Sequence, residues 1–169
     1  EYVEDRDYGD GIALASACQN TLILRTFSKI HGLAALRCGW GYGARGIVEA
    51  LHKVRGAFNV SSVAQAAAQA ALADVQHERR ARSHTTRWRT WLTGRLAESG
   101  YAVIPSVCNF VTVCFDDARA CDVAQANLAQ HGVMVMPLGS YGLPEALRIT
   151  IGTQEANEVV ADGLCRSSA

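Results

Sequence analysis

The sequence predicts an α/β fold whose second part is a small α+β domain, and three observations support this prediction. The apolar run at 21–24 is typical of a buried strand in a parallel sheet. Apolar residues recur at helical spacing at 44–55 and again at 76–99. The rest of the chain alternates short strand patterns with helical ones, which favours a separate α+β domain. We therefore expect one domain in residues 1–99 and a second in residues 100–169.

The composition is that of a globular protein, because 49% of the residues are hydrophobic and 16 basic residues balance 16 acidic ones. A neutral chain has no global field that would attract nucleic acid or an anionic membrane. No apolar run is long enough to span a bilayer. The six cysteines show neither Cys-x-x-Cys pairs nor the spacing of zinc ligands. We expect a cytoplasmic protein with no metal, no nucleic-acid partner and no membrane partner.

Glycine alternation marks the second predicted strand. Gly39, Gly41 and Gly43 alternate with larger residues, so one face of this strand has no side chains. A helix, a second backbone or a flat cofactor can approach such a face.

The other expected elements follow from periodicity and capping residues. In the first part of the chain they are a helix at 10–20, the apolar strand at 21–27, helices at 44–55 and 64–73, and a long helix at 76–99; Ser61 caps the helix at 64–73. In the second part they are strands at 101–105 and 109–115, a helix near 120–131, strands at 133–138 and 146–151, and a final helix capped by Thr153 with Glu155 in its first turn.

The predicted helix at 76–99 is amphipathic and basic. Apolar residues recur in it at three- and four-residue steps: Trp88, Trp91, Leu92 and Leu96. Its basic residues are compatible with a nucleic-acid patch, but the neutral chain and the amphipathic pattern favour a solvated helix face. We assign no metal role to His77 or His84, which lie seven residues apart on this helix.

The candidate site is a lysine at the end of the apolar strand. Thr26 and Ser28 precede Lys29, and Arg37 lies eight residues further on. A lysine whose pKa is lowered from ~10.4 can form a Schiff base with a carbonyl cofactor. An arginine with neighbouring hydroxyls can hold a phosphate dianion. This combination indicates pyridoxal phosphate, whereas a lone Ser-Lys pair would favour a solvated turn lysine beside a surface arginine.

The segment Thr26-Phe-Ser-Lys-Ile-His-Gly-Leu-Ala-Ala-Leu-Arg-Cys-Gly-Trp resembles the lysine segment of fold-type I pyridoxal-phosphate enzymes, specifically histidinol-phosphate aminotransferases and their relatives. The resemblance continues in the family's order through Phe58-Asn-Val-Ser, Pro105-Ser-Val-Cys-Asn-Phe-Val, Gly132-Val-Met-Val and residues 142–153. It implies that residues 1–99 are the C-terminal part of the cofactor-binding large domain, and that residues 100–169 are the small domain. It also implies a homodimer.

The resemblance further assigns roles to individual residues. Lys29 would carry the cofactor and shuttle the substrate's proton. Tyr2 matches a tyrosine that bonds the cofactor's phenolic oxygen, Arg148 matches the arginine that binds the substrate carboxylate, and Asn109 matches a residue that lines the pocket. Apolar neighbours make a charge at position 148 costly unless it is paired, and a guanidinium binds a carboxylate through two parallel bonds. The alternative for Tyr2 is a tyrosine in a terminal strand, and that for Arg148 is an exposed arginine on a strand. The alternative for Asn109 is a polar residue that ends a turn.

One position departs from the family pattern. The family usually has Gly-Val-x-Val-Arg, where the arginine reads the phosphate of histidinol phosphate, but this chain has Gly132-Val-Met-Val followed by Met136. Methionine cannot pair with a phosphate. The departure argues against specificity for that substrate, even with the transamination machinery intact.

The resemblance covers the C-terminal half of a longer enzyme, since the family's ring-nitrogen aspartate, phosphate loop and stacking aromatic are not in this sequence. Three functions stay open at this point. The first is transamination of an amino acid or amino-alcohol phosphate, with a 2-oxo acid as acceptor. The second is decarboxylation, as in threonine-phosphate decarboxylase-like relatives, and the third is a truncated segment without catalysis.

Overall fold

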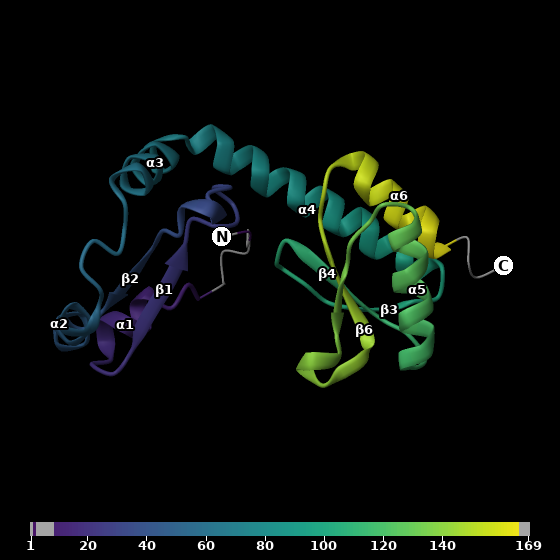
Figure 1. The fold of residues 1–169 in the computed structure, drawn as a ribbon, viewed down its shortest axis with the longest axis horizontal. Coiled ribbons are helices and arrows are strands. Elements are labelled where there is room, and N and C mark those ends of the chain that lie inside the picture. Colours follow the sequence, from purple (N-terminus) through teal and green to yellow (C-terminus); the bar gives the residue numbers. More distant parts are fainter. Residues whose placement is uncertain (1, 3–8, 166–169) are drawn as a thin grey trace. The chain divides into compact units, whose positions relative to one another are not determined.

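A computed structural model of the chain describes residues 2 and 9–165 (Figure 1). It divides into two compact units, which we describe separately: the first ends at Ala81, and the second begins at Arg82 and also includes Tyr2. The division falls inside the long helix α4 (Val75–Glu98). The sequence predicts the domain boundary near residue 100 instead. The correspondence of the units to the large and small domains of an enzyme stays a prediction.

The first unit is built on a hairpin of two antiparallel strands, β1 (Leu22–Thr26) and β2 (Gly39–Gly43). The prediction of a buried strand in a parallel sheet was wrong for β1, because its described partner is antiparallel and Leu24 is 71% exposed. A continuous apolar run does not report strand direction or the extent of burial. Helical elements complete the unit: α1 (Ile12–Ala17), the 3-10 turn η1 (Ala34–Leu36), α2 (Arg45–Val54) and α3 (Ser62–Ala73).

The predicted N-cap of α3 is confirmed. The hydroxyl of Ser61 accepts a hydrogen bond from the backbone N–H of Ala64 at 3.1 Å. This bond satisfies one of the N–H groups that the first turn of a helix leaves without a partner. Ala64 and Ala68, on one side of α3, are buried, which their small side chains allow.

The second unit is a four-stranded antiparallel sheet in the order β3-β4-β6-β5. Its elements are β3 (Ala102–Ile104), β4 (Phe110–Cys114), α5 (Ala118–Gln130), β5 (Met136–Leu138), the 3-10 turn η2 (Gly139–Tyr141), β6 (Leu143–Thr150) and α6 (Gln154–Cys165). The second part of α4, together with α5 and α6, covers one face of this sheet (Figure 1). The α+β architecture expected for this part of the chain is therefore present.

Strand alternation divides the side chains of this sheet between two faces. Val111 and Val113 of β4 lie opposite Ile149 and Leu147 of β6, and all four are buried in the core. The helices contribute the rest of the buried core: Leu92, Leu96, Cys121, Leu128, Val160, Ala161 and Leu164. The residues between these on the strands belong to the face that the three helices do not cover.

The helices of the second unit begin with side-chain caps. Asp117 accepts a hydrogen bond from Ala120 N–H at 2.7 Å and caps α5. Thr153 accepts one from Ala156 N–H at 3.3 Å, which confirms the predicted cap of α6. At the core side of α5, burial raises the pKa of the Cys121 thiol, with the negative charge of Asp122 adding to the effect. This thiol therefore behaves as a small apolar side chain.

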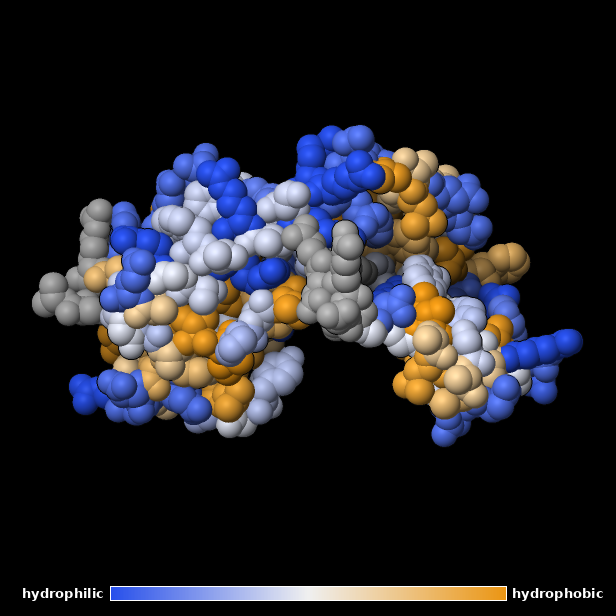
Figure 2. Space-filling view, turned by 180° about the vertical axis from the view of Figure 1, so that it is seen from behind, coloured by the Kyte–Doolittle hydropathy of each residue, from blue (hydrophilic) through white to orange (hydrophobic). Residues whose placement is uncertain are grey.

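The surface of both units carries apolar side chains. Figure 2 shows hydrophobic patches between hydrophilic areas on the face that it draws. Phe58 is 97% exposed, Met134 87% and Val54 80%. None of the helices in the described ranges, residues 2 and 9–165, is long and apolar enough to cross a bilayer.

Candidate functional site

Lys29 lies in a turn that buried neighbours hold in place. Phe27 and Ile30 on either side of it are 5% and 3% exposed, whereas Lys29 is exposed. The turn is closed by hydrogen bonds from Gly32 N–H to the Lys29 carbonyl at 2.9 Å and from Leu33 N–H to the Phe27 carbonyl at 3.0 Å. The buried pair anchors the backbone, so the amine of Lys29 is presented at a defined place.

The hydroxyls predicted to bind phosphate are brought together beside this turn. Thr26 Oγ1 donates to Ser28 Oγ at 2.8 Å and accepts from Ser28 N–H at 3.0 Å. Both residues are half-buried. The local sequence explains the arrangement, since a hydroxyl that bonds the backbone two residues on is typical of a turn that follows a strand.

Arg37 lies at the same end of the hairpin as Lys29. Phe27 N–H donates to the Cys38 carbonyl at 3.1 Å, and Thr26 pairs with Gly39. Arg37 itself adopts the left-handed conformation, with φ 50° and ψ 50°, and its Nη1 donates to the Ala34 carbonyl at 2.6 Å. A non-glycine residue in this conformation costs roughly 1–3 kcal/mol and is found preferentially at functional sites.

The cations at this end of the hairpin are available to an anion. Within the described part of the chain, neither Lys29 nor Arg37 forms an ion pair with a carboxylate. Two exposed cations and a pair of hydroxyls are the donor set that a phosphate requires. The residues present therefore fit the phosphate and the carbonyl of pyridoxal phosphate.

Helix α4 also contacts the lysine turn. His77 Nε2 lies 3.0 Å from the carbonyl of Ile30, so this ring nitrogen carries the hydrogen and donates it. The prediction from the sequence for His77 concerns only a metal role and does not include this contact. The bond joins residues 47 positions apart, and no local pattern in the sequence indicates it.

Arg148 lies on the sheet face opposite the core of the second unit. It pairs with Thr112 of β4 on one side and with Met136 of β5 on the other. Its guanidinium carbon is 5.2 Å from the centre of the Phe110 ring. The described residues give Arg148 no ion-pair partner, so a half-buried cation stacks on an aromatic ring with its donors available to an anion.

Asn109 immediately precedes β4 in a bend of the chain. Its carbonyl accepts a hydrogen bond from Ile151 N–H at 2.9 Å. The backbone of Asn109 is thus paired with the strand end that follows Arg148. The role of its side chain in a pocket stays a prediction.

Tyr2 is half-buried, lies outside the helices and strands, and groups with the second unit. Lys29 belongs to the first unit. The predicted bond between Tyr2 and the cofactor's phenolic oxygen therefore stays a prediction.

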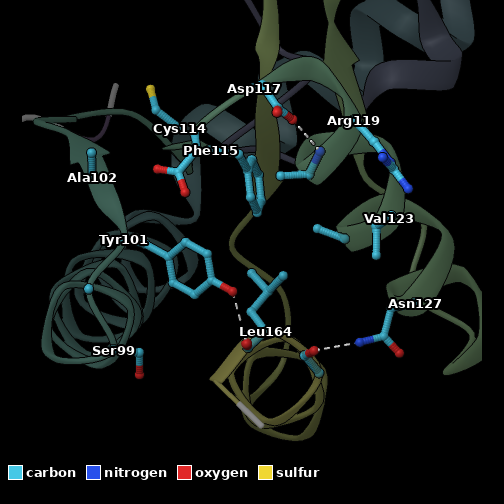
Figure 3. Close-up of a pocket in the computed structure, with 15 residues that line it drawn as sticks. Ser99, Tyr101, Ala102, Cys114, Phe115, Asp117, Arg119, Val123, Asn127 and Leu164 are labelled. Carbon is cyan, nitrogen blue, oxygen red and sulfur yellow. Dashed lines mark hydrogen bonds between the residues drawn. The ribbon is translucent and has the colours of Figure 1, made fainter. Parts of the chain in front are cut away.

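A cavity of about 650 Å³ in the second unit contains none of the predicted site residues (Figure 3). Tyr101, Phe115, Val123 and Leu164 contribute apolar walls. Two of its polar side chains bond within the unit: the Tyr101 hydroxyl donates to the Leu164 carbonyl at 3.0 Å, and Asn127 Nδ2 donates to the Gly163 carbonyl at 2.7 Å. These bonds join α5 and the 101–103 segment to the end of α6, which is a structural role.

Comparison with known proteins identifies the family. The profile of the family Aminotransferase class I and II matches residues 2–164. A histidinol-phosphate aminotransferase of Nitrobacter winogradskyi is 49% identical over 166 residues, which are 97% of this chain and 46% of that protein. The chain thus spans about half the length of the curated relatives it matches.

Solved structures agree with this result. The crystal structure of a histidinol-phosphate aminotransferase from Sinorhizobium meliloti, in complex with pyridoxal 5'-phosphate, superposes with a TM-score of 0.81 at 33% identity over 89% of this chain and 42% of that one. A decarboxylase from Sulfurospirillum multivorans has the same fold, with a TM-score of 0.80 at 20% identity over 94% of this chain and 47% of that one. The predicted fold-type I architecture is therefore confirmed, and the chain belongs to the class I and II aminotransferase family.

Proposed function

We propose that the complete protein containing this chain is a pyridoxal-phosphate-dependent aminotransferase of the histidinol-phosphate type. The observation that carries the proposal is the exposed Lys29 amine beside the bonded hydroxyls of Thr26 and Ser28, at the hairpin end that also bears Arg37. The relatives at 49% identity carry the name histidinol-phosphate aminotransferase, which supports the same reaction class.

The first unit would hold the cofactor. Arg37 and the hydroxyls of Thr26 and Ser28 would bind its phosphate through charge-assisted bonds. Lys29 Nζ would hold its carbonyl carbon covalently between turnovers. When bound, pyridoxal phosphate supplies an electron sink for the negative charge that develops at the substrate Cα.

Arg148 would bind and orient the amino donor. A guanidinium forms two parallel bonds to a carboxylate or phosphate, and stacking on Phe110 at 5.2 Å restricts the plane that the guanidinium can adopt. Lys29 Nζ would be freed when the substrate amine takes its place on the cofactor. The free lysine amine would then act as a general base, taking the proton from the substrate Cα and returning it at the cofactor carbon. The second substrate is a 2-oxo acid, which accepts the amino group.

Borohydride reduction tests this assignment directly. Reduction of the cofactor-loaded full-length protein, followed by peptide mapping, should leave a pyridoxyl group on Lys29. Lys53 is the only other lysine of the chain, so it serves as an internal control. A label on Lys53, or none on this chain, would show that Lys29 is not the cofactor lysine.

Decarboxylation is the second candidate reaction. The similarity to the Sulfurospirillum decarboxylase supports a shared fold and does not favour its chemistry. The two reactions differ in which bond at Cα breaks. Incubation with an amino-alcohol phosphate or amino acid and 2-oxoglutarate should yield glutamate, whereas release of carbon dioxide would favour the decarboxylase.

We further propose that the complete protein is a cytoplasmic homodimer. All six cysteines are free thiols, which fits a reducing compartment. Exposed apolar side chains such as Phe58 and Val54 in the first unit fit a surface that a second copy covers. Light scattering of the full-length protein should give twice the mass of one chain.

A further inference from the structure

Two side chains of α4 bond backbone carbonyls next to the residues predicted to bind substrate. Arg89 Nη1 donates to the carbonyl of Cys108 at 2.8 Å. His84 Nε2 lies 2.8 Å from the carbonyl of Gly152, to which it donates. Cys108 directly precedes Asn109, and Gly152 lies two residues beyond the end of β6. All of these residues belong to the second unit.

The two anchored segments are also paired with each other. Ile151 N–H donates to the Asn109 carbonyl at 2.9 Å, and Phe110 lies opposite Thr150. Helix α4 therefore bonds the backbone next to both strands of the β4–β6 pair, just before β4 begins and just after β6 ends. Phe110, two residues after the carbonyl that Arg89 holds, provides the ring on which Arg148 stacks.

Arg89 and His84 differ in whether another side chain also bonds the carbonyl that each of them holds. The Gly152 carbonyl also accepts from Asn157 Nδ2 at 3.1 Å, and Gly152 N–H donates to Asn157 Oδ1 at 3.0 Å. Asn157 is 1% exposed and holds Gly152 without His84. Arg89 is the one side chain among the described residues that bonds the Cys108 carbonyl. Ser106 Oγ holds the same segment from its other side, since it accepts from Cys108 N–H at 3.1 Å and donates to the Phe110 carbonyl at 2.7 Å. Loss of Arg89 leaves the Cys108 carbonyl without that partner, whereas loss of His84 does not free Gly152.

We propose that Arg89 is a positioning residue for the carboxylate-binding site. Together with Ser106, it fixes the backbone at Cys108 ahead of Phe110. The Phe110 ring then sets the plane of the Arg148 guanidinium. This inference rests on the proposed role of Arg148. It assigns a function to one basic residue of α4, and the neighbouring Arg87 has no such contact: its guanidinium lies over the Trp88 ring at 5.4 Å and is exposed.

A kinetic comparison tests the proposal in the full-length protein. Arg89→Ala should raise KM for the amino donor about tenfold and change kcat less than about twofold, because the bond lost orients substrate and does not act on the reacting atoms. Arg89→Lys keeps a charged donor and should recover part of the loss. Arg87→Ala removes the same charge from α4, and His84→Ala removes the other anchor; neither should change KM more than about twofold.

An NMR experiment tests the positioning role of Arg89 independently of the proposed enzymatic function. The side-chain protons of Arg148 should be shielded by the Phe110 ring in the NMR spectrum of the 169-residue chain, with Arg148→Lys as the assignment control. In a folded Arg89→Ala chain these resonances should move toward their values in unstructured peptides. Unchanged resonances would overturn the positioning role. Altered resonances in a full-length protein that has no transaminase activity would support the positioning role and contradict the proposed function.

Discussion

Met136 and Arg148 are the pair of residues on which we expect substrate choice to depend. They lie directly opposite each other on β5 and β6. Cross-strand partners have Cβ atoms about 4.5–5.5 Å apart, so the side chain at position 136 lies beside that of Arg148. A methionine beside Arg148 makes this part of the sheet face half apolar. Amino donors with a carboxylate and an apolar or aromatic side chain fit such a surface.

We predict that Met136→Arg raises kcat/KM for histidinol phosphate in the full-length protein. A charge-assisted bond is worth ~1.5–3 kcal/mol, or roughly tenfold to hundredfold. The constant for an aromatic amino acid should not rise. Met134→Arg, which adds the same charge at an 87% exposed side chain, is the matched control. An equal change for both donors would mean that position 136 does not face the substrate.

At the scale of single elements, the hairpin depends on the bare face of β2. A Cβ at Gly39 would lie 2.5 Å from the Arg25 carbonyl oxygen, and one at Gly43 would lie 2.7 Å from the Thr21 carbonyl oxygen. Both distances are shorter than a van der Waals contact. The atoms contacted belong to the backbone, which cannot move aside as the end of a flexible side chain can. The glycines predicted to let a backbone approach closely therefore do so, and the neighbouring backbone is that of β1 and of Thr21 directly before it.

Gly39→Ala should lower the free energy of unfolding by about 1–3 kcal/mol, since an added methyl group has to displace β1. It should also weaken cofactor binding, because Thr26 pairs with Gly39. Gly46→Ala is the control: no atom lies within 4 Å of its Cβ position in α2, and helix propensity should make it about 0.5–1 kcal/mol more stable. Urea denaturation measures both variants, and equal effects would contradict the close approach.

The start of α6 should give the chain a pH-dependent stability. Hydrogen bonds from the backbone N–H of Glu155 and from Thr153 lower the pKa of Glu155. A lowered folded pKa stabilises the folded state above the unfolded pKa, and this contribution is lost as the pH falls through the folded value. Glu155→Gln should therefore lower Tm at pH 7 and have no effect in acid below the lowered pKa. Glu158→Gln in the same helix controls for loss of one charge; a Tm difference that stays constant with pH would refute the prediction.

At the scale of the whole molecule, the two units differ in the core that they contain. The core cluster of buried residues lies entirely in the second unit. Among the described residues of the first unit, the buried apolar ones are Ala15, Phe27, Ile30, Ala64 and Ala68, of which three are alanine. Burial of apolar area is the main source of stability, so the first unit is held together by less of it.

Hydrogen exchange of the 169-residue chain should reflect this difference. The amides of β4 and β6 should exchange at least about tenfold more slowly than those of β1 and β2, because regions with few buried apolar contacts open more readily. Mass spectrometry of peptic fragments measures both strand pairs in one sample. Equal protection would mean that the units open together.

Several features were determined by the sequence alone because they depend on neighbours along the chain. The lysine turn, the caps at Ser61 and Thr153, the helices and the α+β pattern of the second part all follow from local periodicity and short-range hydrogen bonding. The match of ordered segments also determined the family, since it needs no geometry.

Only the tertiary structure decided which distant residues meet. It pairs β1 with β2 in antiparallel orientation, sets Met136 against Arg148, and joins His77 to Ile30 and Arg89 to Cys108. An apolar run looks the same in either strand orientation, and a histidine or arginine on a helix looks the same whether it is solvated or bonded to a carbonyl. Such contacts depend on how the elements pack, and the spacing of residues along a single element carries no information about its partner.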